Sequence, residues 1–268
     1  MNKQKRVGKI VENIKKIKIQ GARNIAKSAL YAYSLIPDKK TKLKLIKARA
    51  TEPMLINTLN KFNKLGYKKT LAHFQEAQNK INLLVYKLIK NNSIIFTHCH
   101  STNVTNALIY AHKHKKKFQV YNTETRPLYQ GRITSRQLRK AGIKTTQFVD
   151  SAARTALMQA KKILGVDLVF FGADAILKSG VINKIGSGMF AEIAYDNKIP
   201  VYIIADSWKF SPKNVKIEER DYKEVWNKSP KNIKIKNPAF ELIPARYIKT
   251  IVSELGILSL PAFVKKVT

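Results

Sequence analysis

The sequence predicts an α/β fold, and two changes of pattern along the chain support this. Up to about residue 90, apolar residues recur at three- and four-residue spacings, the period of an amphipathic helix. From residue 91 on, short apolar runs alternate with helical patterns. Strands separated by helices of this length form parallel sheets through right-handed crossovers. We therefore expect a helical N-terminal domain, residues 1–90, followed by a Rossmann-like parallel-sheet domain, residues 91–268.

The N-terminal part contains only segments with a helical period. These are 7–18, 22–33, 39–51, 53–65 and 70–89. Their boundaries are marked by Pro37-Asp38, by Glu52-Pro53 and by Gly66, since proline and glycine favour helix starts and ends.

The second part alternates between two kinds of segment. The predicted strands are 93–99, 118–123, 145–149, 168–171 and 201–205, and the predicted helices between them are 104–116, 134–141, 152–164 and 189–197. A lysine-rich stretch, 212–236, is expected to be an exposed excursion, and a last helix is expected over 245–255.

Each predicted strand runs into a reactive or charged residue. In chain order these are Cys99, Glu124, Asp150, Asp174 and Asp206. Because ligands of open parallel sheets bind at the carboxyl ends of the strands, these residues are expected to make a cleft. The apolar run before Asp174 is typical of a strand covered on both faces, and the small and polar loop after it suggests close approach to a ligand.

The composition narrows the class of protein. The net charge of +34 would ordinarily indicate a polyanion partner. The lysines are spread along the chain and no nucleic-acid-binding motif accompanies them, so a solvated surface is favoured and a nucleic acid is not expected as partner. The single cysteine excludes an internal disulfide and suits a reducing, cytoplasmic location. No segment resembles a secretion leader or a membrane span, so no membrane is expected as partner.

Cys99 is the first candidate for chemistry. A thiol near a helix N-terminus and cationic neighbours has its thiolate favoured, which would make it a base or nucleophile near neutral pH. The alternative is a small buried hydrophobe, but the polar flanks favour the reactive interpretation. His98 and His100 share a face of the strand and could hold a metal, although no third ligand at a fixed spacing is visible.

The other charged residues at strand ends have structural alternatives. Asp150 is equally consistent with a helix N-cap and with a ligand contact. Glu124 is expected to pair with Arg126, and Asp174 could simply cap the turn that follows it.

Taken together, the motifs resemble those of one superfamily. They are THCHS (97–101), TETRPLYQGR (123–132), DSAA (150–153), GADAI (172–176), NKIGS (183–187) and the late WKF (208–210). Their order is similar to that of the archaeal ribose-1,5-bisphosphate isomerases, the methylthioribose-1-phosphate isomerases and the regulatory subunits of translation initiation factor 2B. The enzymes of this superfamily carry both the cysteine and the aspartate that stand here at positions 99 and 174, and THCHS and ATEPML (50–55) are closest to the ribose bisphosphate branch.

The resemblance implies an isomerase that converts α-D-ribose 1,5-bisphosphate to D-ribulose 1,5-bisphosphate in nucleotide (AMP) salvage, without cofactor or metal. Cys99 would be the base and Asp174 the acid. The substrate and its phosphates would be bound by Gln20, Gly21, Ala22, Arg23, Arg49, Ser101, Thr102, Asn103, Asn183, Lys184 and Lys209. The resemblance also implies a homo-oligomer, a dimer or a hexamer built from dimers.

Some positions depart from the family pattern. Gln20 and Arg23 stand where that pattern has arginine and glycine, so the first phosphate site is expected to be rebuilt or weakened. Ala50 stands where the pattern has proline. The alternatives are methylthioribose-1-phosphate isomerase and a non-catalytic regulatory subunit of the initiation factor 2B type.

Overall fold

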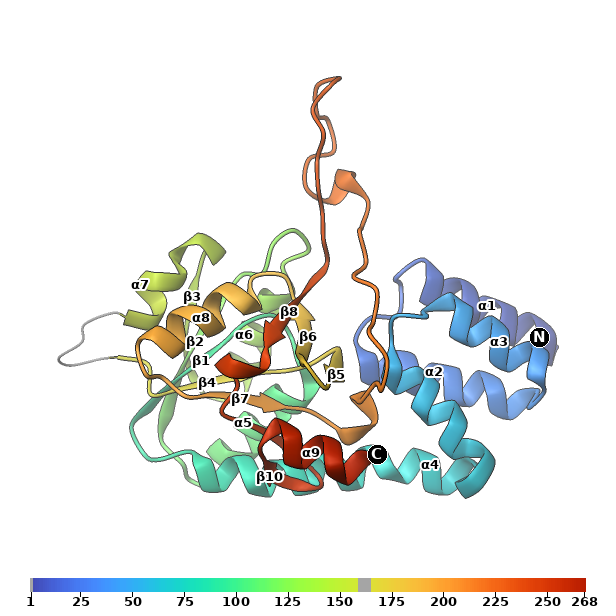
Figure 1. Ribbon diagram of the computed structural model, residues 1–268, viewed down its shortest axis with the longest axis horizontal. Coiled ribbons are helices and arrows are strands. Elements are labelled where there is room, and N and C mark those ends of the chain that lie inside the picture. Colours follow the sequence, from blue (N-terminus) through green and yellow to red (C-terminus); the bar gives the residue numbers. More distant parts are fainter. Residues whose placement is uncertain (1, 159–164) are drawn as a thin grey trace.

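A computed structural model describes residues 2–158 and 165–268. Its N-terminal part is helical, as predicted, and lies to one side of the molecule (Figure 1). The helices are α1 (Lys3–Lys15), α2 (Ala22–Leu35), α3 (Lys39–Ala48) and α4 (Pro53–Leu88). Apolar faces of α1, α2, α3 and the start of α4 pack into one cluster that includes the buried Ile14, Leu45 and Leu59.

Helix α4 joins this part to the rest of the chain. It is continuous apart from Gly66, whose φ of 72° and ψ of 174° are not helical and separate two straight halves. Ile81 and Val85 of the second half are buried against Val104 and Leu108 of α5 (Thr102–Lys113). The long helix therefore belongs to both cores, and the domain boundary at residue 90 stays a prediction.

The central sheet has the strand order β10-β9-β7-β4-β1-β2-β3. Its strands are β1 (Ser93–Thr97), β2 (Phe118–Thr123), β3 (Lys144–Phe148), β4 (Leu168–Phe171), β7 (Val201–Ile204), β9 (Thr250–Ser253) and β10 (Gly256–Leu258). All neighbours pair in parallel except β10, which is antiparallel to β9. The predicted α/β class is confirmed, with buried layers on both faces of the sheet.

The helices between the strands follow the predicted alternation. They are α5, α6 (Gln130–Lys140), α7 (Ala153–Met158) and α8 (Ser187–Asp196). The end of the helix predicted over 152–164 falls on 159–164, outside the described residues. None of the helices in the described ranges is long and apolar enough to cross a lipid bilayer.

The second half contains a small sheet that was not predicted and a long arm that was expected as an exposed excursion. Residues 175–184, interpreted as a loop, form β5 (Ala175–Leu177) and β6 (Gly180–Lys184), which pair with β8 (Phe240–Pro244) in a small antiparallel sheet. Between β7 and β8 the lysine-rich excursion projects from the body as a long arm, residues 211–239, drawn in orange in Figure 1.

The helix predicted over 245–255 is wrong. This stretch forms a short 3-10 turn, Ala245–Tyr247, and then β9, whose Ile251 and Val252 are fully buried beside β7. The last helix is α9 (Leu260–Val267). A short apolar run is compatible with a helix or with a buried strand, and here the free edge of β7 decided the outcome.

Candidate functional site

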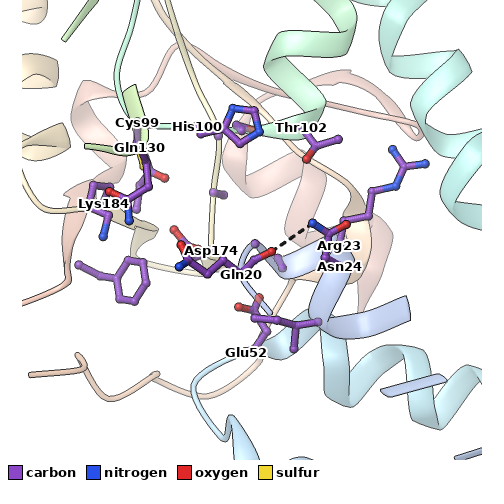
Figure 2. A pocket seen from close by; sticks show the side chains of 18 of the residues that line it. Gln20, Arg23, Asn24, Glu52, Cys99, His100, Thr102, Gln130, Asp174 and Lys184 are labelled. Carbon is purple, nitrogen blue, oxygen red and sulfur yellow. Dashed lines mark hydrogen bonds between the residues drawn. The ribbon is translucent and has the colours of Figure 1, made fainter. Parts of the chain in front are cut away.

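A cavity of about 490 Å³ lies between the N-terminal helices and the carboxyl edge of the central sheet (Figure 2). Every residue predicted for the site lines it. They are Gln20, Gly21, Ala22, Arg23, Arg49, Cys99, Ser101, Thr102, Asn103, Asp174, Asn183, Lys184 and Lys209. Residues from the helical part and from the sheet part thus meet at one place.

Of the charged residues at strand ends, only Cys99 and Asp174 line this cavity. Asp150 does not cap a helix through its side chain, which instead accepts hydrogen bonds from the backbone N–H groups of Thr125 (2.8 Å) and Arg126 (2.6 Å). The predicted cleft of five such residues is therefore wrong, because the side chains at the other strand ends hold loops.

The remaining strand-end carboxylates have partners of their own. Glu124 accepts from Arg132 at 2.9 Å, so its predicted pair with Arg126 is wrong. The Arg126 guanidinium donates instead to the Tyr129 hydroxyl. Asp206 lies 3.1 Å from Nε2 of His73.

Cys99 is held by its backbone just beyond the end of β1. Its φ of 66° is left-handed, which ends the strand two residues earlier than predicted. Its N–H donates to Oγ1 of Thr125 at 3.0 Å, and its carbonyl accepts from Oγ1 of Thr134 at 2.9 Å. A non-glycine residue in this region of φ/ψ space is uncommon and, here, points its side chain into the cavity wall.

Burial raises the pKa of the Cys99 thiol to about 11, while the nearby Lys184 ammonium lowers it in part. Desolvation penalises the thiolate more than the cation favours it. The prediction that the surroundings favour the thiolate is therefore wrong for the ligand-free protein.

His98 and His100 point to different partners. Nδ1 of His98 lies 2.5 Å from Oγ1 of Thr123 and its Nε2 lies 2.9 Å from the carbonyl oxygen of Ile185. Nδ1 of His100 lies 3.0 Å from Oγ1 of Thr134. Burial lowers the pKa of His98 to about 4, so its ring is neutral and serves to join β1 to the loop before α8.

Asp174 follows β4, the most central apolar strand. Its N–H donates to the carbonyl oxygen of Ile182 at 2.9 Å, which fixes the turn into the small sheet. Burial raises the pKa of its carboxyl, and Lys209, Lys184, Arg49 and Arg220 act in the opposite direction. Lys209 is itself buried and its ammonium donates to the carbonyl oxygen of Ala173, so a cation is fixed one residue away.

The two predicted phosphate-binding arginines already have partners. Arg23 donates to the Phe74 carbonyl oxygen at 2.8 Å and to Oε1 of Gln78 at 3.2 Å. Nη2 of Arg49 lies 2.8 Å from Oε2 of Glu218. Among the described residues Nε of Arg49 has no hydrogen-bond partner, and the N-terminus of α2, where Gly21 is the N-cap, adds backbone N–H groups at this end of the cavity.

The second predicted phosphate site combines a helix N-terminus with fixed polar groups. Ser101 caps α5 through a 3.5 Å bond from the Val104 N–H, and Thr102 begins the helix. Asn103 donates to Oε1 of Gln78 at 3.0 Å, and Asn183 donates to Oγ of Ser187 at 2.9 Å. These bonds hold the side chains in place around the N-terminus of α5.

Sequence reasoning missed several residues that line the cavity. These are Lys18, Asn24, Glu52, Gln130, Gln137, Arg220 and Phe240, among others, and His100 was considered only as a metal ligand. Arg220 comes from the base of the arm, which was expected to be exposed. Glu52 was interpreted only as a helix boundary. The sequence does not indicate that a carboxyl residue just before the first proline of a helix faces a cavity, because many such residues cap their own helix.

Comparison with known proteins places the chain among relatives of known chemistry. Residues 65–260 match the initiation factor 2 subunit family. The chain is 32% identical to ribose 1,5-bisphosphate isomerase of Archaeoglobus fulgidus, over 91% of this chain and 87% of that protein. It is 32% identical to the protein of that name from Thermococcus kodakarensis, over 95% and 91%. It is also 31% identical to methylthioribose-1-phosphate isomerase of Pelotomaculum thermopropionicum, over 94% and 82%.

Solved structures have the same fold. The translation initiation factor eIF-2B of Pyrococcus horikoshii OT3 superposes with a TM-score of 0.84 at 27% identity, over 98% of this chain and 99% of that chain. The eIF-2B subunit delta of A. fulgidus gives 0.76 at 25% identity, over 97% and 90%.

Proposed function

The chain belongs to the initiation factor 2 subunit family, and from that membership we propose that it isomerises ribose 1,5-bisphosphate to ribulose 1,5-bisphosphate. The family resemblance of the motifs is thereby confirmed. The chain is an enzyme that acts on a sugar phosphate, as the names of its relatives over most of its length support. The observation that carries the choice of chemistry is the presence of Cys99 and Asp174 in one cavity.

The proposed reaction needs two groups, each of which takes up one proton and gives up one proton. Asp174, as an acid, gives a proton to the ring oxygen, which opens the ring while Cys99, as a thiolate, takes the proton from C2. An enol phosphate with a double bond between C1 and C2 results. Asp174, now a carboxylate, takes the proton of the C2 hydroxyl, and the Cys99 thiol returns a proton to C1. The product has a carbonyl at C2, and both side chains are restored.

The cavity offers suitable surroundings for a doubly charged pentose. The N-termini of α2 and α5 open onto it from different elements, and each favours an anion. Lys184 and Lys209 are buried in its wall, so each would be close to bound substrate without screening by bulk water. We propose that these cations and helix ends hold the two phosphates.

Two other functions differ from this one in a measurable way. The similarity to methylthioribose-1-phosphate isomerase makes that sugar phosphate the first competing substrate. The fold and 27% identity shared with eIF-2B of P. horikoshii favour a non-catalytic regulatory subunit as the second candidate. A regulatory subunit would bind its partner equally well after Cys99→Ala.

The test offers both sugar phosphates to one preparation and follows the product by NMR. We expect ribulose 1,5-bisphosphate from the wild type, and a loss of at least about 10²-fold in kcat with Cys99→Ser and with Asp174→Asn, because each removes a proton-transfer group. Asp196→Asn, at the exposed end of α8, is the matched control and should keep full activity. A folded wild-type protein that makes no ribulose bisphosphate would refute the proposal.

The wider setting is also proposed. Ribose 1,5-bisphosphate is formed from nucleotide breakdown in AMP salvage, and its ketose product is the substrate of a ribulose-bisphosphate carboxylase. A cytoplasmic location and a homo-oligomeric state, dimer or hexamer, stay predictions, to be checked by fractionation and by light scattering.

A further inference from the structure

Glu52 is a buried carboxyl that the proposed chemistry has not used. It precedes α4 as its N-cap residue, yet its side chain makes no capping hydrogen bond. It is only 4% exposed, and its Oε1 has no hydrogen-bond partner in the part of the chain that the structure describes. Its side chain lines the same cavity as Asp174 (Figure 2). A buried acidic oxygen without a partner is costly, which calls for a role.

The start of α4 is tied to the segment that carries Lys209. The Asn57 amide, in the second turn of α4, donates to the carbonyl oxygens of Trp208 (2.7 Å) and Phe210 (2.9 Å) on either side of Lys209. Lys209 in turn donates to the carbonyl oxygen of Ala173, next to Asp174. These contacts tie the start of α4 to the segment of Lys209, and that segment to the backbone next to Asp174. Glu52, Lys209 and Asp174 line the same cavity.

The charged groups around Glu52 and Asp174 do not neutralise both carboxylates. The groups that face them are Arg49 at the end of α3, Lys184 of β6, Lys209, and Glu218 and Arg220 of the arm. Glu218 already pairs with two of these cations: its Oε2 lies 2.8 Å from Nη2 of Arg49, and its Oε1 lies 3.4 Å from Nε of Arg220. Among the described residues, neither Glu52 nor Asp174 has a salt bridge. A buried and a half-buried carboxylate with a shared and partly used set of cations do not both ionise easily.

We propose that Glu52 is a positioning residue for catalysis, which forms with Asp174 a carboxyl pair that holds one proton at neutral pH. Asp174 thereby enters the reaction able to protonate the ring oxygen. The inference rests on the proposed isomerase function and adds to it the group that keeps the acid protonated. The pKa of Glu52 agrees with this proposal, because burial and Asp174 raise it from 4.5 to about 8.

The pH profile of kcat/KM tests the pair. The active form has a Cys99 thiolate and a protonated Asp174, and burial raises the thiol pKa to about 11, above the value of about 8 for Glu52. Activity should therefore rise with pH as the thiolate forms, and level off once the carboxyl pair loses its last proton.

Glu52→Gln removes the second carboxyl and keeps the size of the side chain. We expect the rise to end at a lower pH and the plateau to fall with it, by about tenfold for each pH unit by which the end of the rise moves. Glu52→Asp keeps the acidic group and should keep a plateau closer to the wild type. Glu76→Gln, on the exposed face of the same helix, is the matched control and should leave the profile unchanged. If the activity of Glu52→Gln rose over the same pH range as that of the wild type and was lower by the same factor at every pH, the proposed carboxyl pair would be refuted.

A second measurement needs no substrate. Because Glu52 binds its proton more tightly in the folded than in the unfolded chain, it makes the wild type less stable as pH rises from 4.5 to about 8. The Tm of Glu52→Gln relative to wild type should therefore increase by about 3 °C or more between about pH 5 and about pH 8.5. A constant Tm difference would refute the inference even if the isomerase activity holds. A wild type without activity would instead refute the proposed function, while the Tm series still decides about the proton.

Discussion

Two features of its surroundings shift the pKa of the Cys99 thiol in opposite directions. Its burial disfavours the thiolate, whereas Lys184, buried in the same wall, favours it. Burial has the larger effect, so in the ligand-free protein the thiol is protonated across the neutral range. At neutral pH the Cys99 thiolate is therefore a minor form, but a thiolate whose thiol has a high pKa is a strong base. The proposed reaction would proceed through this minor form.

The rate of alkylation by iodoacetamide measures this directly, because Cys99 is the only cysteine. We expect the rate to rise about tenfold per pH unit through pH 9 without the plateau of a free thiol, whose pKa is about 8.5. Lys184→Met keeps the length of the side chain but removes the cation, so it should slow alkylation further at each pH. Lys178→Met, at an exposed position, should have no effect. A wild-type plateau below pH 9 would contradict the buried-thiol interpretation.

Residue types at the site could be predicted from the sequence, but their ionisation could not. The strand-end positions of Cys99 and Asp174 follow from local pattern. The burial that sets the pKa of Cys99, and the approach of Glu52 to Asp174, depend on how α4 docks on the sheet, and no local pattern contains that information.

At the level of elements, α4 depends on one glycine. The φ and ψ of Gly66 lie in a region that only glycine adopts readily, and its carbonyl oxygen accepts a 2.7 Å bond from Oγ1 of Thr70. The bend directs the first half of α4 to the N-terminal helices and the second half to the sheet.

Gly66→Ala should destabilise the protein by about 1–3 kcal/mol, because alanine is strained at this φ/ψ although the site has free space. Gly8→Ala, in the middle of α1 and equally free of neighbours, should instead stabilise it by about 0.5–1 kcal/mol. Urea unfolding of the two variants gives both values. Equal effects of the same sign would show that Gly66 carries no special conformation.

Elements were predictable where their pattern was self-contained. The strands 118–123 and 168–171 are confirmed with their bounds. The second is an apolar run that ends at Gly172. Strand β9 was missed because its identity depends on pairing with β7, a partner far away in the sequence, and β10 pairs in turn with β9. The small sheet was missed for the same reason, since β8 lies beyond the whole arm.

At the level of the molecule, the net charge of +34 is a source of repulsion. One of the few acidic groups, Glu218, pairs with Arg49 and so joins distant segments. The lysines at the surface, unlike the buried Lys184 and Lys209, face solvent, where salt reduces their mutual repulsion.

We expect the Tm to rise by about 2 °C or more when NaCl increases from about 10 mM to about 300 mM, because the Debye length shrinks from about 30 Å to below 10 Å. KCl at equal ionic strength should give the same rise, since the effect is screening. An unchanged or lower Tm would mean that attractive ion pairs outweigh the repulsion.

The contact between Arg49 and Glu218 joins positions 169 residues apart. During synthesis on the ribosome, the segment with Arg49 is exposed long before its partner has been translated. The helices and first strands can therefore form early, while the substrate pocket gains its final charge balance only after the base of the arm has left the exit tunnel. A nascent chain stalled just before Glu218 would contain both the thiol and the aspartate, and still lack a finished active centre.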